Sequence, residues 1–261
     1  MAASPNLGHA SLVMERSLAS GRGGRERGQA AVESALVLPL TLFLVLGSLQ
    51  LFLMFQARVM AEYAAFRATR AGSVNHGDCE AMNHAALAAL LPTLRPTTNP
   101  DELANAFGAV RDNRFGDGYT TSVTGIENEE VVWIFRERPL AGDIPNVEDR
   151  AFDARFSEPM QLQVRLVYWY PMRIPFADWV IYRAAAASMG VARYAAQNPL
   201  LLTEKADWRQ ESSDTLTDEV LSRVRSNVSS RTYLFPIQAS HTMRMMTPAK
   251  QQYFEGSQNC F

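Results

Sequence analysis

Residues 28–55 read GQAAVESALVLPLTLFLVLGSLQLFLMF, and the rest of the chain is arranged around them. From residue 34 to residue 55 no side chain carries a formal charge. A helix of that length spans roughly 33 Å at ~1.5 Å per residue, close to the ~30 Å hydrocarbon thickness of a bilayer. A buried core helix is the alternative, but such helices seldom stay uncharged for about six turns. The pattern therefore predicts a transmembrane helix over residues 34–55.

Charged residues stand directly before this apolar run. Arg22, Arg25 and Arg27 precede Gly28, and Glu33 lies at the start of the run itself. A carboxylate within a membrane helix costs on the order of 2.5 to 3.5 kcal/mol on insertion scales, so Glu33 calls for a binding partner or a specific role. A carboxylate that only satisfies the N-terminal dipole of the helix is the simpler alternative.

The order of these residues resembles a prepilin signal, in which a membrane peptidase cuts after a glycine that four small or apolar residues separate from a glutamate. This resemblance implies cleavage after Gly28, a new N-terminus at Gln29, and Glu33 as the fifth residue of the mature chain. The chain departs from the signal at Ser34, a position that is often aromatic. The sequence SALVLPLTLFLVLGSLQLF, with AEYAAFRATRAG behind it, is similar to the TadE-like proteins, minor pilins of the tight-adherence (Flp) pilus system, chiefly over residues 27–72.

The resemblance implies a non-enzymatic minor pilin or pseudopilin in the bacterial inner membrane. Its N-terminus would be cytoplasmic and its C-terminal domain extracytoplasmic, and it would join a surface pilus. Its partners would be a prepilin peptidase, other pilins or pseudopilins, the pilus assembly platform and the lipid bilayer. Glu33 would meet the terminal amine of Gln29 of a neighbouring subunit. Two alternatives remain open: a permanently anchored envelope protein with a ligand-binding outer domain, and a type II secretion pseudopilin.

Three parts of the chain are expected: a cytoplasmic leader over residues 1–28, a long helix over residues 29–72, and an extracytoplasmic domain over residues 73–261. Beyond residue 55 the helix becomes rich in alanine with spaced charges, which predicts its continuation into water as far as Gly72. The alanines either allow close approach to other subunits or simply favour the helix. They are Ala57, Ala61, Ala64, Ala65, Ala68 and Ala71.

The remaining residues predict an α+β fold with an antiparallel sheet and flanking helices. The best strand covers residues 160–170, where apolar residues alternate with Gln161, Gln163 and Arg165. A long surface loop is expected over residues 136–158. Further helices are expected over residues 79–94, 101–110 with Asp101 as cap, 176–197 and 214–228, and further strands over residues 119–123, 131–135, 231–238 and 241–246.

Composition and motifs give no indication of catalysis or of a cofactor. The formal net charge is −2, which argues against nucleic acid as a partner. No Walker A, nucleophile-elbow, dinucleotide-binding or zinc-protease motif is present. His76, Cys79 and His84 form the one cluster that suggests a metal, but they lack the further ligand pair that zinc sites use. Glu127, Glu129 and Glu130 are expected in a solvated turn.

The two cysteines suit each other as disulfide partners. Cys79 and Cys260 both fall on the side of the membrane expected to be oxidising. A bond between them would close a very long loop, worth on the order of 4 to 5 kcal/mol in an ideal entropy model. The sequence leaves both the bonded and the unbonded state open.

Overall fold

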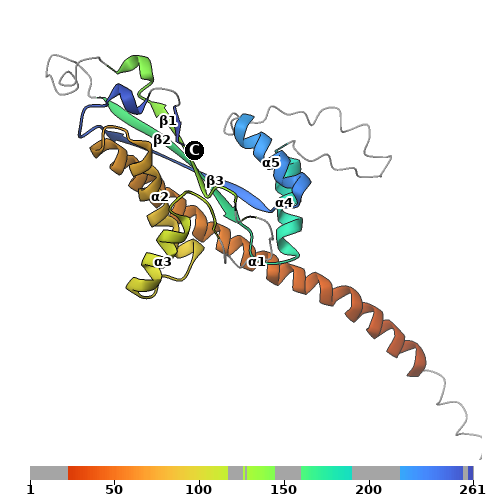
Figure 1. The fold of residues 1–261 in the computed structure, drawn as a ribbon. Helices are drawn as coiled ribbons and strands as arrows, with labels where there is room; N and C mark the ends of the chain where they lie inside the picture. Colours follow the sequence, from red (N-terminus) through yellow and green to blue (C-terminus); the bar gives the residue numbers. More distant parts are fainter. Residues whose placement is uncertain are drawn as a thin grey trace, which may run out of the picture. The chain divides into compact units, whose positions relative to one another are not determined.

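The computed structural model describes residues 23–116, 126, 128–144, 160–189, 218–254 and 258–260. The strand expected over residues 119–123 therefore lies outside the described residues. The chain divides into two compact units, Met1–Val45 and Leu46–Phe261. Helix α1, Gly23–Val74, contributes residues to both units, and all other elements belong to the second (Figure 1). The predicted α+β class, with one long apolar N-terminal helix and an antiparallel sheet, is confirmed.

Helix α1 is longer at both ends than the expected range 29–72. It begins at Gly23, so the last residues of the expected leader are helical, and it ends at Val74. Gly72 does not end the helix as expected. A side chain at Gly72 would lie within 3 Å of Met82 and Leu162, so the glycine allows close packing there. The chain turns instead at His76 and Gly77, both at positive φ.

Helix α2, Cys79–Leu94, has the predicted bounds. It begins there because the carboxylate of Asp78 accepts hydrogen bonds from the backbone N–H groups of Glu80 and Ala81, which the first turn leaves without partners. The structure thus adds the capping residue, Asp78, which the sequence analysis had not named.

Helix α3, Pro100–Val110, starts one residue earlier than expected, and its cap differs from the prediction. The side chain of Asn99, not Asp101, accepts a hydrogen bond from the backbone N–H of Glu102 at 2.8 Å. Pro100 fixes the first helical position, since proline is well suited to the start of a helix. Asp101 therefore lies inside the first turn.

The sheet has four antiparallel strands, in the order β3 (Leu234–Arg244), β2 (Gln161–Pro171), β1 (Val132–Arg138) and β4 (Asn259–Cys260). One predicted break is wrong: residues 231–238 and 241–246 were expected as two strands, but β3 is a single strand. It pairs continuously with β2, and eleven opposed residue pairs outweigh the small residues Ala239 and Ser240 between the expected strands. The expected loop over residues 136–158 also begins later, because β1 and a short 3-10 helix, η1, occupy its start. Helix η1 covers Ala141–Asp143.

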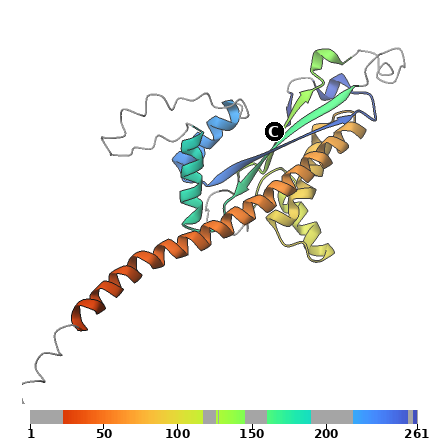
Figure 2. The ribbon, with the colours of Figure 1, turned by 180° about the vertical axis from the view of Figure 1, so that it is seen from behind.

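Helices cover both faces of the sheet (Figure 2). Helices α1, α2 and α3 lie on one side, and α4, Ala177–Ser188, and α5, Asp218–Ser230, lie on the other. The predicted alternation in β2 is confirmed, since its even-numbered residues from Leu162 to Tyr170 are buried. Val167 and Trp169 point to the opposite face and are also buried. Helix α5 lies over that face, and the guanidinium of Arg223 lies 5.9 Å from the centre of the Trp169 ring.

The glutamates expected in a solvated turn have structural contacts. Glu129 forms an ion pair with Arg223 of α5, and the carboxylate of Glu130 accepts a hydrogen bond from the indole N–H of Trp133. The turn before β1 is therefore tied to the α5 side of the sheet. Glu127 lies outside the described residues.

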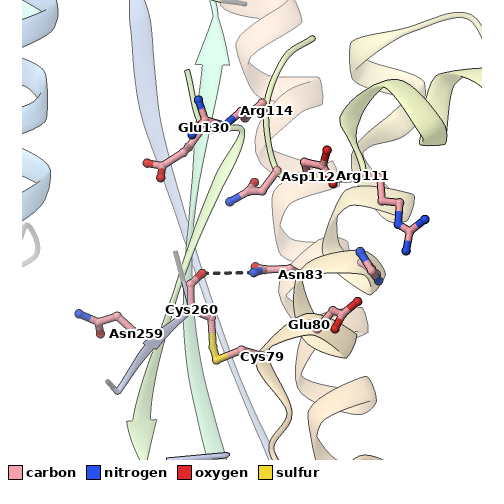
Figure 3. Close-up of a pocket in the computed structure, with 11 residues that line it drawn as sticks. Cys79, Glu80, Asn83, Arg111, Asp112, Arg114, Glu130, Asn259 and Cys260 are labelled. Atoms are coloured by element: carbon pink, nitrogen blue, oxygen red, sulfur yellow. Dashed lines mark hydrogen bonds between the residues drawn. A yellow bond between two sulfur atoms is a disulfide. The ribbon is translucent and has the colours of Figure 1, made fainter. Parts of the chain in front are cut away.

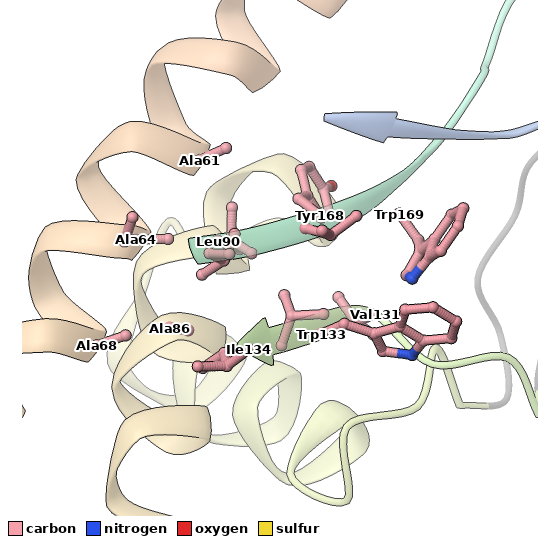
Figure 4. Packing of buried hydrophobic residues seen from close by; sticks show 14 of the residues in the cluster. Ala61, Ala64, Ala68, Ala86, Leu90, Val131, Trp133, Ile134, Tyr168 and Trp169 are labelled. Atoms are coloured by element: carbon pink, nitrogen blue, oxygen red, sulfur yellow. The ribbon is translucent and has the colours of Figure 1, made fainter. Parts of the chain in front are cut away.

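The alanine-rich part of α1 packs against the chain's own sheet and α2 (Figure 4). Ala64 and Ala68 are fully buried and lie toward Ala86 and Leu90 of α2 and Tyr168 of β2. Small side chains allow a helix to approach its neighbours closely. Most of the alanine face therefore packs against other parts of the same chain. The sequence analysis had considered only contact with other subunits and helix propensity. Its buried members are Ala57, Ala61, Ala64, Ala65 and Ala68.

A buried arginine holds the C-terminal segment to the sheet. Arg136 of β1 is 3 % exposed, and its guanidinium donates hydrogen bonds to the backbone carbonyls of Gly77, Tyr253 and Gln258 at 2.9, 2.6 and 3.2 Å. It also lies 4.2 Å from the centre of the Phe254 ring. Burial lowers the pKa of Arg136 to about 10. One side chain thus joins the turn after α1, the 3-10 helix η5, Gln251–Tyr253, and the residue before β4.

Candidate functional site

The N-terminal part of α1 exposes apolar side chains on all sides. Every residue from 31 to 42 is exposed, including Leu36 at 71 % and Leu40 at 65 %. A helix over Ala31–Val74 is long and apolar enough to span a membrane. An apolar surface this extensive is not stable in water, and it is typical of a segment that contacts lipid or other helices. The large side chains involved are Val32, Leu36, Val37, Leu38, Leu40, Leu42, Leu44, Val45 and Leu49.

The predicted processing and assembly residues lie near the start of this helix. Gly28 and Gln29 are within α1, and Glu33 follows about 6 Å beyond Gln29 along the axis at ~1.5 Å per residue. Glu33 is exposed, so its carboxylate is accessible to another molecule. Proline at position 39 does not end the helix; two residues later the Thr41 hydroxyl donates to the backbone carbonyl of Leu38 at 2.9 Å.

Gln50 forms a contact that the sequence alone did not reveal. Its side chain is fully buried, and its Oε1 accepts hydrogen bonds from the backbone N–H groups of Arg173 and Ile174, at 3.3 and 3.0 Å. These two residues follow β2 in the bend PMRIPF, and the Arg173 guanidinium donates to the backbone carbonyl of Thr93 at the end of α2. Gln50 thus joins α1 to the loop between β2 and α4. An amide within an apolar run was the signal available in the sequence.

Cys79 and Cys260 are joined by a disulfide. They come from the start of α2 and from β4, and the Nδ2 of Asn83 donates a hydrogen bond to the Cys260 carbonyl at 3.4 Å (Figure 3). Beside the disulfide lies an open pocket of ≈ 540 Å³. Charges of both signs line it, from Glu80, Arg111, Asp112, Arg114 and Glu130.

The histidines considered for a metal site have other contacts. His76 Nδ1 lies 2.7 Å from the Pro248 carbonyl oxygen, and the His84 ring packs edge-on against Phe107. With Cys79 in a disulfide, these residues do not converge on a common point. Within the described ranges, no group of three His, Cys, Asp or Glu side chains is placed to hold a metal ion.

Comparison with known proteins gives one family match. Residues 28–70 match the family model described as TadE-like protein, and the match begins at Gly28. No curated protein and no solved structure gives a significant match to the chain. The match covers most of α1, including the exposed apolar residues, Glu33 and Gln50, and none of the sheet. The resemblance found in the sequence is therefore confirmed over residues 28–70, where this chain is similar to the TadE-like proteins.

Proposed function

We propose that the chain is a non-enzymatic minor pilin or pseudopilin of a tight-adherence (Flp-type) pilus. The observation that carries this proposal is the family match over residues 28–70, which coincides with a helix whose N-terminal part is apolar and exposed on all sides. Proteins of this family take part in pilus assembly, and such a helix suits membrane insertion followed by packing with the helices of other subunits.

The proposal includes processing by a prepilin peptidase after Gly28. The family match begins at this residue, and Glu33 stands at the required spacing from it. After cleavage, the terminal amine of Gln29 would carry a positive charge. Glu33 of an adjacent subunit would bind this amine, since pairing lowers the cost of a carboxylate in lipid.

The mature N-terminus tests processing directly. We expect protein from the membrane fraction of its native host to begin at Gln29, and the variant Gly28→Ala to begin at Met1. Gly24→Ala, a glycine-to-alanine change four residues upstream, is the matched control and should be processed normally. A native chain that retains residues 1–28 would contradict cleavage and favour the permanently anchored envelope protein. Processing of Gly28→Ala would also contradict the proposal.

The role of Glu33 is tested by separating insertion from assembly. Glu33→Ala should remain in the membrane fraction but be lost from sheared pili or from their assembly complex. Glu62→Ala is the control, because Glu62 is also exposed on α1 but pairs with Arg58 of the same helix at 3.0 Å. Equal assembly of the two variants would exclude a specific role for Glu33.

A further inference from the structure

Gln50 is the first buried residue of α1 after the exposed apolar residues. Before it, residues 31–49, in which Glu33 is the one charged residue, form a segment of roughly 28 Å at ~1.5 Å per residue, which already matches the ~30 Å thickness of the hydrocarbon layer. If α1 spans the membrane, as the proposed function requires, a buried amide bonded to the backbone N–H groups of the bend PMRIPF marks the level at which the lipid ends. The bilayer surface then lies near Gln50 rather than near residue 55.

The loop bound by Gln50 leads directly into α4. The Ile174 carbonyl accepts from the N–H of Asp178 at 3.0 Å, so the first turn of α4 is tied to the residue that Gln50 holds. Figures 1 and 2 both show the start of α4 beside α1. The start of α4 therefore lies at the level of Gln50.

This part of α4 exposes large aromatic side chains. Phe176, directly before the helix, is 61 % exposed, and Trp179 in its first turn is 47 % exposed. Arg183 is also exposed and lies one turn after Trp179, on the same face of the helix. On the neighbouring α1, Phe52 and Phe55 are exposed as well, at 66 % and 68 %.

Tryptophan is enriched at the membrane–water interface, where its ring lies among the headgroups, and arginine is attracted to anionic lipid phosphates. We infer that the start of α4 rests on the bilayer surface, with Phe176 and Trp179 in the headgroup region and Arg183 facing lipid phosphate. The lipid surface is the fitting occupant because the bend that leads into α4 is bonded to Gln50, at the end of the apolar segment of α1. The contact would fix the orientation of the folded domain relative to the membrane.

Quenching of tryptophan fluorescence by brominated lipids tests this inference. The full-length protein is placed in vesicles of phosphatidylethanolamine and phosphatidylglycerol, with bromine near the headgroup or near the end of the acyl chain. The difference between the wild type and Trp179→Phe isolates the signal of Trp179. We expect the shallow label to quench that signal at least about twofold more strongly than the deep label.

Two further variants, both carrying Trp179→Phe, provide controls. Leu44→Trp reports insertion and should be quenched by the deep label. Met246→Trp places a tryptophan at another exposed position and should not be quenched. The N–H of Met246 bonds to the carbonyl of Ser73, about 35 Å along α1 from Gln50.

These signals separate the two proposals. If Leu44→Trp is quenched but Trp179 is not, the interfacial contact is wrong and membrane insertion stands. If Leu44→Trp is not quenched, insertion itself fails. If Trp179 is protected from the brominated lipids and this protection disappears when the protein is diluted in the bilayer, a second copy of the chain covers this face. That result would overturn the inference. Arg183→Glu should weaken the quenching of Trp179 in phosphatidylglycerol vesicles but not in neutral phosphatidylcholine vesicles, and equal quenching in both would contradict the role of Arg183.

Discussion

Cys79 and Cys260 are 181 residues apart in sequence, yet a disulfide joins them and their Cα atoms are 5.2 Å apart. The bond fixes the start of α2 to β4, a two-residue strand that pairs with Ile134 and Phe135 of β1. So short an edge strand contributes few hydrogen bonds of its own. The disulfide and the contacts of Arg136 with the carbonyls of Tyr253 and Gln258 therefore hold the C-terminal segment in place.

Removal of this disulfide should destabilise the folded domain. In the entropy model, a loop of this length contributes about 5 kcal/mol, and measured values are often lower. We expect the double variant Cys79→Ser with Cys260→Ser to unfold at a clearly lower urea concentration than the oxidised wild type. Reductant should lower the midpoint of the wild type and leave that of the double variant unchanged. An unchanged wild-type midpoint in reductant would show that the bond does not stabilise the fold.

A larger side chain on the alanine face of α1 should destabilise the isolated protein. Ala64 is fully buried, so Ala64→Leu adds volume to a packed core and should cost about 1 to 3 kcal/mol of the free energy of unfolding. Ala104→Leu, at an exposed position of α3, is the matched control and should change stability little. If Ala64→Leu is as stable as the wild type but fails to assemble, the alanine face serves contacts between subunits instead.

Replacement of Gln50 by leucine should loosen the bend between β2 and α4. Gln50→Leu leaves the backbone N–H groups of Arg173 and Ile174 without their acceptor, at a cost of about 1 to 3 kcal/mol. Hydrogen exchange at these two amides should become faster, by the factor that corresponds to this loss of free energy. Gln56→Leu, at an exposed position of α1, should leave both amides unaffected. Unchanged exchange in Gln50→Leu would exclude this anchor.

Stability should depend on Tyr182 at high pH. Burial between α4 and α5 raises the pKa of Tyr182 well above its usual range, while its hydroxyl donates to the Val224 carbonyl at 3.4 Å. Above pH ~10 the phenol ionises in the unfolded chain but stays protonated in the folded one. The folded state then holds more protons, so the free energy of unfolding falls as pH rises above ~10 and is unaffected below.

The variant Tyr182→Phe isolates this effect. The lowered pKa of Arg136 acts in the opposite direction in the same pH range, but it is common to both proteins and cancels in the comparison. We expect the difference in unfolding free energy between wild type and Tyr182→Phe to shrink or reverse between pH 9 and pH 12. A constant difference over this range would show that Tyr182 titrates equally in both states.

Local patterns were reliable where a few neighbouring residues suffice. The uncharged run from Ser34 predicted the apolar helix, the pattern over residues 79–94 predicted the bounds of α2, and the alternation in β2 predicted its buried face. Local patterns failed where two adjacent signals compete. Asn99 rather than Asp101 caps α3, and pairing with β2 carries β3 through a weak local sequence.

Length, apolar character, periodicity and the family resemblance of α1 follow from residues near one another in the chain, because hydropathy and helix caps act over a few turns. The partners of Gln50, Cys79 and Arg136 do not, because each contacts residues more than 50 positions away. The burial of the alanine face likewise depends on how α1 packs against α2 and β2. Folding brings these groups together through the packing of the whole domain, and no short sequence pattern encodes such distant contacts.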